Sequence, residues 1–306
     1  MPDTRPTRAT TDGRAYLDLQ NLARRQGRPT DELHQLYALE GFLARLTASD
    51  YSDRFVLKGG VLLAAFGTRR PTRDIDLLAH DLSNAPANML TCMKAIASIP
   101  VDDGLNLDAG SATADLIRDD EEYAGVRVTM PGSLSIARIQ FHIDINIGDP
   151  VSPAPEPVRL PRILGGELVV TGYPLAMVLA EKIITMLQRR DASTRWRDFA
   201  DVCTLSRCRQ IDGTQLTASL TLVGAHRRVR LISLPEALDG MTGPAQPKWA
   251  AWRRKQRIEQ QIPEQFAEVL HHVTRFADPA ISGSADKMAW DPARLSWTTQ
   301  ATDGTP

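Results

Sequence analysis

Cysteine is scarce in this chain of 306 residues, and what there is does not form a recognisable set. The three cysteines are Cys92, Cys203 and Cys208, an odd number without the Cys-x-x-Cys spacing of a zinc site. A disulfide framework would need an even set of cysteines in an oxidising compartment. We therefore expect reduced thiols in a cytoplasmic protein.

Long apolar stretches are also missing. The sequence has no run of about 18 apolar residues, so no transmembrane helix is predicted. The first 16 residues lack the apolar core of a secretory signal and are predicted to be a short flexible arm. We expect no membrane partner.

A strong net charge of either sign is the third absence. The formal net charge is -1, and the chain has 42% hydrophobic and 24% charged residues, as an ordinary globular protein does. Basic residues are nevertheless concentrated in four segments, at 69–73, 189–197, 227–230 and 253–257. One such segment alone is most simply a solvated face, but four of them would suit a protein that binds phosphate groups.

The hydrophobic pattern predicts an α/β (α+β) fold with a small mixed sheet. Helical periodicity from residue 11 to 48 precedes alternating segments typical of strands, at 73–78, 123–130 and 134–147. The turn residues Pro131-Gly132-Ser133 are predicted to join the last two strands, and residues 101–117 to form an acidic loop.

A proline-rich segment predicts the domain boundary. Pro153, Pro155 and Pro157 mark a connector, which gives domains 1–150 and 151–306. The second domain is predicted to be mainly helical, with helices at 175–186 and 199–205 and a helical segment at 249–276 that Pro263 interrupts. The last 30 residues are predicted to be a loosely packed tail.

The strongest chemical signal is a glycine pair followed by two aspartates. Gly59 and Gly60 precede a predicted helix, where glycine permits close backbone approach and free N–H groups can bind phosphate. Asp74 and Asp76 are two residues apart in a predicted strand, so both carboxylates project from one face. Hard oxygen ligands at this spacing suit Mg²⁺ (or Mn²⁺), although such a pair also occurs by chance on exposed strand edges.

Asp144 follows the same alternation in the segment 141–145. It is predicted to be a third metal ligand, and the alternative is an aspartate on the solvated side of a sheet. His142 would share its face, either as a neighbour of the site or as a histidine with ordinary hydrogen-bond partners.

Gly59-Gly60 with Arg73-Asp74-Ile75-Asp76 resembles the first motif of the DNA polymerase β-like nucleotidyltransferases. The longer string KGGVLLAAFGTRRPTRDIDLL resembles the AbiEii/AbiGii toxin family within that superfamily, which includes the MenT-type toxins. A second signature of the family is matched by Glu181-Lys182, Arg189-Arg190 and Arg197-Asp198-Phe199-Ala200-Asp201-Val202. The resemblance covers roughly residues 50 to 210.

The resemblance implies a metal-dependent nucleotidyltransferase that uses an NTP. Asp74 and Asp76 would hold the metal, Lys182 would contact the nucleotide phosphates, and Asp198 or Asp201 would be the essential aspartate of the second signature. Gly60 stands where the superfamily often has serine, so backbone N–H groups would replace a hydroxyl there. The remaining nucleotide-binding residues are predicted to be Lys58, Gly59, Gly60 and Arg73.

The resemblance also implies biological partners. It predicts the toxin of a toxin–antitoxin pair, which modifies the 3′ acceptor end of tRNA, blocks aminoacylation and has a cognate antitoxin protein. In related toxins a Ser or Thr near the first motif can be phosphorylated, so Thr72 is the predicted regulatory residue. The alternative is that the Thr72 hydroxyl merely caps its turn.

The same residues also allow two other functions. A nucleotidyltransferase of the same superfamily could modify a protein or a small molecule, or the chain could be a non-catalytic nucleotide-binding module. Trp249 and Trp252 beside the basic residues 253–257 could form a stacking surface for RNA, or a helix with aromatic anchors in the core.

Overall fold

The computed structural model describes residues 5–117, 125–190 and 195–299. The chain divides into two compact units, which we call the sheet unit (Met1–Asp149 with Glu156–Tyr173) and the helical unit (Pro150–Pro155 with Pro174–Pro306). The chain crosses from the sheet unit after Asp149, returns to it with the hairpin 156–173, and crosses again after Tyr173. The boundary at 150–151 stays a prediction.

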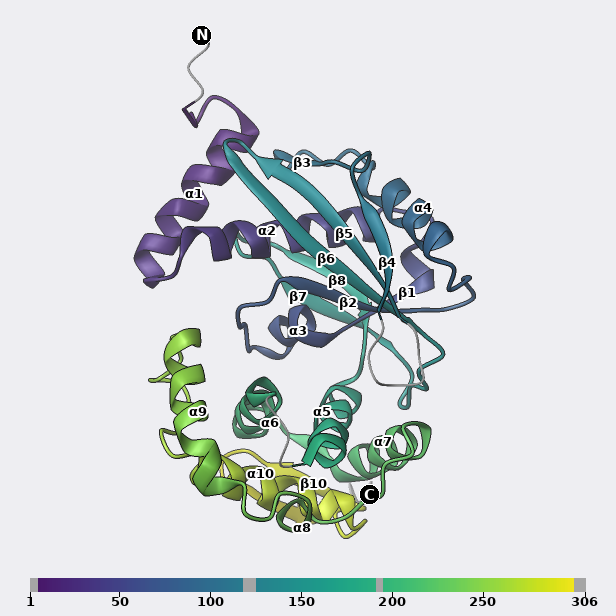
Figure 1. The fold of residues 1–306 in the computed structure, drawn as a ribbon, viewed down its shortest axis with the longest axis vertical. Coiled ribbons are helices and arrows are strands. Elements are labelled where there is room, and N and C mark those ends of the chain that lie inside the picture. The colour runs from purple at the N-terminus through teal and green to yellow at the C-terminus, as the bar shows by residue number, and fades with distance from the viewer. Residues whose placement is uncertain (1–4, 118–124, 191–194, 300–306) are drawn as a thin grey trace, which may run out of the picture. The chain divides into compact units, whose positions relative to one another are not determined.

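The sheet unit is built on a mixed sheet, as predicted, and this sheet has eight strands among the described residues (Figure 1). The strand order is β3-β5-β6-β2-β1-β8-β7, with β4 also paired to β5. The pairs β2–β6 and β1–β8 are parallel and the others are antiparallel. The strands are β1 (Phe55–Lys58), β2 (Asp74–Ala79), β3 (Leu105–Leu107), β4 (Thr113–Ile117), β5 (Gly125–Leu134), β6 (Ala137–Ile147), β7 (Glu156–Pro161) and β8 (Glu167–Gly172).

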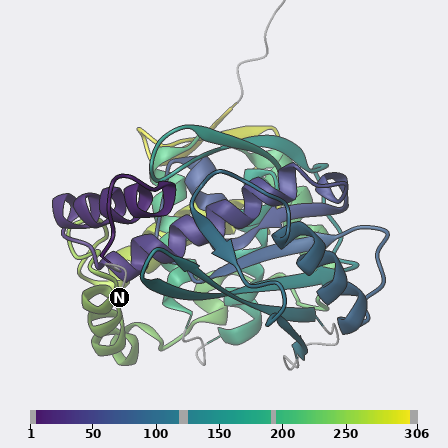
Figure 2. The ribbon, with the colours of Figure 1, turned by 90° about the horizontal axis from the view of Figure 1, so that it is seen from above.

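Helices cover one face of this sheet. The helix α2 lies across β6 and β8, and α1 packs beside α2 (Figure 2). Phe42 of α2 meets Phe141 of β6 edge to face at 5.9 Å, so the odd-numbered residues of β6 point into this core together with Ile75 and Leu77 of β2. The helical segments of the unit are α1 (Thr11–Gln26), α2 (Thr30–Thr47), η1 (Ser52–Arg54), α3 (Gly59–Leu62), η2 (Leu63–Phe66) and α4 (Pro86–Ala97).

The hairpin of β5 and β6 differs from the prediction. Pro131, Gly132 and Ser133 lie inside β5, and the turn falls at Ser135, whose φ is 49°. These residues pair with β6 on one side, and Gly132 and Ser133 also pair with β3 on the other, so sheet pairing overrides their local turn preference. The predicted loop 101–117 is wrong for the same reason, because β3 and β4 both add to β5. Tyr123, the predicted start of this strand, lies outside the described residues.

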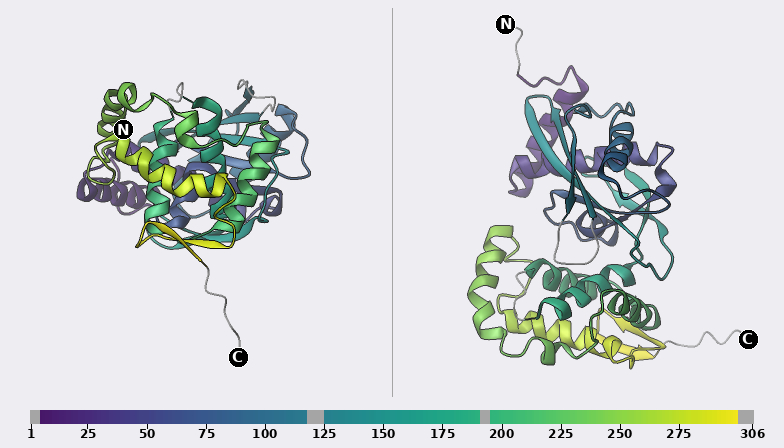
Figure 3. Two further views of the ribbon diagram at one scale, coloured as in Figure 1. Left: turned by 90° about the horizontal axis from the view of Figure 1, so that it is seen from below. Right: turned by 45° about the vertical axis from the view of Figure 1, so that its right-hand side comes forward.

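The helical unit confirms the prediction of a mainly helical second part. α10 runs across its other long helices (Figure 3, left) and contacts α6, α7 and α9. The elements are α5 (Leu175–Arg189), α6 (Trp196–Cys208), β9 (Ile211–Asp212), α7 (Gly213–His226), α8 (Leu234–Ala237), α9 (Thr242–Gln256), α10 (Phe266–Ile281), β10 (Met288–Asp291) and β11 (Ser296–Thr299).

One prediction for the C-terminal part was wrong. Residues 288–299 are not a loose tail but a hairpin that adds to β9, and the buried Trp290 donates from its indole to the Ser206 carbonyl at 2.6 Å. The segment 249–276 is helical with a break around Pro263, as predicted, because α9 ends at Gln256 and α10 begins at Phe266. In the described part of the chain, every helix is too short or too polar to cross a lipid bilayer.

A buried ion pair joins α2 to the segment before β3. Arg45 donates to both carboxylate oxygens of Asp103, at 2.7 and 3.1 Å, and to the carbonyls of Gly41 and Leu105. Both side chains are 4% exposed, and Tyr37 donates its hydroxyl to the Asp103 carbonyl at 2.7 Å. The guanidinium thus satisfies polar groups of two elements in a place that water does not reach.

We predict that Arg45→Met lowers the free energy of unfolding by about 3–5 kcal/mol, because it leaves the Asp103 carboxylate buried without its cation. The double variant Arg45→Met with Asp103→Asn should recover part of this loss, since no charge then remains buried. Urea denaturation of the three proteins measures both effects. A single variant as stable as the wild type would show that the pair contributes nothing.

Candidate active site

The two aspartates of the first motif open β2. Ile75 and Leu77 are fully buried on the core face, so Asp74 and Asp76 share the opposite face, where both are half-buried. This is the arrangement that the spacing predicted. It gives two carboxylates that a cation could reach.

Charged residues continue across the sheet beside Asp76. In register order, Lys58 of β1, Asp76 of β2, Asp144 of β6 and Arg127 of β5 lie on four neighbouring strands. Arg127 donates to both oxygens of Asp144, at 2.7 and 2.6 Å. At the other end of the row, Lys58 donates to Asp149 at 2.6 Å. Two carboxylates in the middle of the row are therefore flanked by one cation on each side.

The electrostatics of this row favour a positive ligand at Asp76. Burial raises the pKa of Asp76, and the charges of Asp144 and Asp74 add to the effect. Lys58 and the N–H of Gly60 act in the opposite direction without cancelling it. A divalent cation would relieve this repulsion, so the residues present fit the metal that the sequence predicts.

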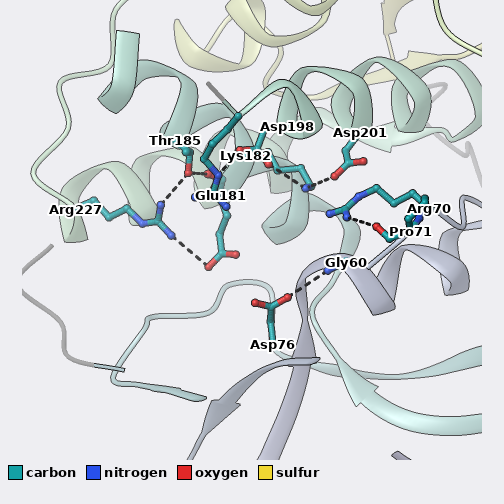
Figure 4. A network of polar contacts seen from close by, with 11 residues as sticks. Gly60, Arg70, Pro71, Asp76, Glu181, Lys182, Thr185, Asp198, Asp201 and Arg227 are labelled. Atoms are coloured by element: carbon teal, nitrogen blue, oxygen red, sulfur yellow. Dashed lines mark hydrogen bonds and ion pairs between the residues drawn. The ribbon is translucent and has the colours of Figure 1, made fainter. Parts of the chain in front are cut away.

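The glycine pair lies directly against Asp76. Gly59 has a φ of 67°, and a Cβ at this residue would lie 1.8 Å from Asp76 Oδ2, so a side chain there would force Asp76 to move. The N–H of Gly60 points toward the same oxygen at 3.4 Å (Figure 4). The helix that follows has only four residues and continues as the 3-10 segment η2. The role of Gly59 and Gly60 in phosphate binding stays a prediction.

The loop between η2 and β2 is fixed from outside the site. Arg69 pairs with the buried Glu40 of α2 at 2.5 Å, and Glu40 also accepts from the Ile163 N–H at 2.9 Å. Burial raises the pKa of Glu40.

Thr72 in this loop is 9% exposed, with its hydroxyl 3.4 Å from the Asp74 carbonyl, whereas Arg73 is exposed. Phosphorylation of Thr72 and nucleotide binding by Arg73 stay predictions.

The helical unit assembles the second signature. Lys182 of α5 donates to Asp201 at 2.6 Å and lies 3.3 Å from an oxygen of Asp198 (Figure 4). The two aspartates are three residues apart on α6, so they share one helix face. All three side chains are buried. The structure thus brings together the lysine and both candidate aspartates, and the lysine does not extend into solvent.

Three charged residues near these sites were missed in the sequence. Arg127 and Asp149 carry no motif of their own, and their roles depend on strand pairing. Arg227, at the end of α7, donates to Thr185 at 3.1 Å and lies 3.7 Å from Glu181, the neighbour of Lys182 (Figure 4). The basic segment 227–230 was the one signal that pointed to it.

A three-carboxylate metal site is not found. Within residues 5–117, 125–190 and 195–299, no group of three or more His, Cys, Asp or Glu side chains is arranged to hold a metal ion. Both oxygens of Asp144 already accept bonds from Arg127, so its role as a third ligand stays a prediction. Asp74 and Asp76 alone suffice for Mg²⁺, which commonly binds one or two carboxylates together with substrate phosphates.

Comparison with known proteins defines the class. Residues 41–281 match the family model described as nucleotidyl transferase AbiEii toxin, type IV TA system. The chain belongs to this family and is therefore a nucleotidyltransferase of the toxin type. Nucleotidyltransferases of this kind use an NTP and a divalent metal.

The fold agrees with this assignment. The structure is similar to that of MenT4, a nucleotidyltransferase toxin of Mycobacterium tuberculosis H37Rv, with a TM-score of 0.51 and 15% identity over 87% of this chain and 98% of that one. JHP933 from Helicobacter pylori matches with a TM-score of 0.33 and 13% identity, over 71% of this chain and 93% of that one. No curated protein sequence matches the chain.

We predict that Gly59→Ala lowers the transfer rate by at least about 100-fold, because the new methyl group displaces Asp76 by an ångström or more. Gly27→Ala is the matched control. Gly27 has a φ of 63° and open space around its Cβ position, so that variant places alanine at a similar positive φ without the clash. Steady-state rates of both variants decide the matter. Equal rates would mean that Asp76 does not need its present position.

Proposed function

We propose that this protein is a toxin that transfers nucleotides from an NTP to the 3′ acceptor end of tRNA and so blocks aminoacylation. One observation carries the proposal: Asp74 and Asp76 share an accessible strand face, and Gly59, whose backbone leaves no room for a Cβ, lies against Asp76. Membership of the AbiEii family supports the toxin role and an antitoxin partner.

The proposed reaction is an in-line displacement at phosphorus. The 3′ hydroxyl oxygen of the acceptor bonds to the α-phosphorus of the NTP, the bond to pyrophosphate breaks, and a carboxylate accepts the hydroxyl proton. When bound, a divalent cation held by Asp74 and Asp76 would neutralise charge on the phosphate oxygens.

Other residues would bind the nucleotide phosphates. Lys182 would do so with its ammonium, held in place by Asp198 and Asp201. Gly59, Gly60 and Arg73 would bind phosphate from the first motif.

The exposed charges of α9 support an RNA substrate. This helix has no acidic residue, and its buried side carries Ala245, Trp249 and Arg253. Trp249 donates to the Pro263 carbonyl, and Arg253 donates to the carbonyls of Glu259 and Ile262, so these two residues are anchors, not a surface for RNA.

Trp252 is half-exposed and is accompanied by the exposed cations Lys248, Arg254, Lys255 and Arg257. Arginine and lysine next to an aromatic ring suit phosphates and an unpaired base.

Control of the enzyme would act through Thr72. A phosphate on this hydroxyl would add about -1.5 to -2 charges two residues before Asp74. That charge would repel the triphosphate or bind the cation in its place. The buried state of Thr72 means that the loop has to open before a kinase can reach the hydroxyl.

Transfer from labelled NTPs to total RNA tests the proposed function. We expect label in the tRNA fraction, no transfer by Asp74→Ala or Asp76→Ala, and weaker nucleotide binding by Lys182→Ala. Asp53→Ala, which removes an exposed carboxylate elsewhere in the sheet unit, is the control and should keep full activity. If label enters only protein or small molecules, tRNA is not the substrate. If Asp76→Ala keeps normal turnover, the assignment of Asp76 as a metal ligand is wrong.

RNA binding should weaken steeply with salt, because each cation on phosphate releases counterions. Replacing Arg254 and Lys255 of α9, or Arg189 and Arg190 at the end of α5, by alanine should lower the slope of log affinity against log salt by about 0.7 per lost contact. Arg159→Ala, at an exposed residue of β7 paired with Glu167, is the control. Filter binding between about 50 and 200 mM salt provides the slopes. A slope near zero in the wild type would exclude the RNA backbone as the ligand.

A further inference from the structure

Lys58 stands next to the candidate metal ligand but is held by another residue. Its Cα is the register partner of Asp76 on the neighbouring strand. Its ammonium donates to Asp149 Oδ2 at 2.6 Å and lies 5.6 Å from the centre of the Tyr173 ring. The Lys58 side chain is 9% exposed and that of Asp149 is 15% exposed. The ammonium is thus fixed between a carboxylate and an aromatic face, with little contact with water.

The position of this ammonium matters for Asp76. The charge of Lys58 acts on the Asp76 carboxylate, in the direction opposite to that of Asp144 and Asp74. An ammonium that moved onto Asp76 would occupy a carboxylate oxygen that a divalent cation needs. Lys58 and Asp76 are close enough for this exchange, since they face each other across one strand pair.

We propose that Asp149 is a positioning residue, which holds the Lys58 ammonium away from Asp76 and so keeps the Asp76 carboxylate available to a divalent cation. The inference rests on the proposed function in one respect, namely that Asp76 is a metal ligand. Lys58 would then not bind phosphate, as the sequence predicted, but would be a fixed positive charge beside Asp76. Asp149 acts through Lys58 and touches neither metal nor nucleotide.

The Mn²⁺ affinity without nucleotide, measured by titration calorimetry, tests the proposal. The four full-length proteins compared are the wild type, Asp149→Asn, Lys58→Met and the double variant. Asp149→Asn should weaken Mn²⁺ binding by about tenfold, because the released ammonium competes for Asp76. Lys58→Met should bind Mn²⁺ at least as tightly as the wild type. The double variant should return to within about threefold of the wild type, because the competing charge is gone.

Suppression of one variant by the other is the decisive result. If Asp149 served only the stability of the sheet unit, Lys58→Met would not restore metal binding to Asp149→Asn, and that outcome overturns the proposal. Equal Mn²⁺ affinity of Asp149→Asn and the wild type overturns it too. Asp76→Asn distinguishes a failure of the positioning role of Asp149 from a failure of the proposed function. If Asp76→Asn binds Mn²⁺ as the wild type does, Asp76 is not a metal ligand, and the positioning role is overturned as well.

Two controls keep the test valid. The exposed pair Arg159 and Glu167 of the β7–β8 hairpin supplies a matched variant, Glu167→Gln, whose Mn²⁺ affinity should not change. Thermal melts show whether each protein is folded. If Asp149→Asn does not fold, Lys58→Met decides alone: unchanged NTP affinity with Mn²⁺ binding at least as tight as in the wild type supports the proposal. Weakened NTP affinity in Lys58→Met overturns it, because Lys58 would then be a phosphate ligand.

Discussion

The close approach of the Gly59 backbone to the Asp76 carboxylate is the constraint on which the candidate site depends. A Cβ at residue 59 would overlap Asp76 Oδ2, and the φ of 67° is one that glycine adopts without strain. β1 and β2 pair antiparallel, so the turn after Lys58 comes back against the start of β2. The glycine therefore determines where the backbone N–H groups of residues 59 and 60 can lie relative to the two aspartates.

The charges around Asp76 lower the stability of the sheet, and the fold does not require them. Carboxylates on neighbouring strands repel one another, and the burial of Asp76 adds to the penalty for its charge. A hydrophobic residue at 76 would be expected to make a more stable sheet, because buried ionic groups are seldom net stabilisers. A sheet that keeps Asp74, Asp76 and Asp144 together is better explained by the chemistry of a cation and phosphates than by folding.

Local patterns predicted the elements of the site, and long-range pairing determined the rest. The alternation around Asp74 and Asp76 gave their shared face because a strand has period two. The position of the β5–β6 turn was not predictable in this way, since Pro131-Gly132-Ser133 has the composition of a turn. A turn at 131–133 would place Arg127 opposite Ala137, whereas the observed register places it opposite Asp144. An error of a few residues in one hairpin thus hid the cation that binds Asp144. Asp149 was hidden for a similar reason, because its partner lies 91 positions away in the sequence.

A buried lysine bound by carboxylates occurs in both units. Lys58 is held by Asp149 in the sheet unit, and Lys182 by Asp198 and Asp201 in the helical unit. Removing two charges from water is expensive, and the attraction between them repays it only when further bonds satisfy both groups. Such pairs contribute little to stability, but they fix the position of an ammonium that would otherwise rotate freely on four methylenes. For Lys182, a fixed ammonium suits a role in binding phosphate. The entropy of the side chain is lost when the protein folds, so substrate binding does not lose it again. For Lys58, the same fixation has the opposite effect, because it keeps a positive charge from a carboxylate that must stay available.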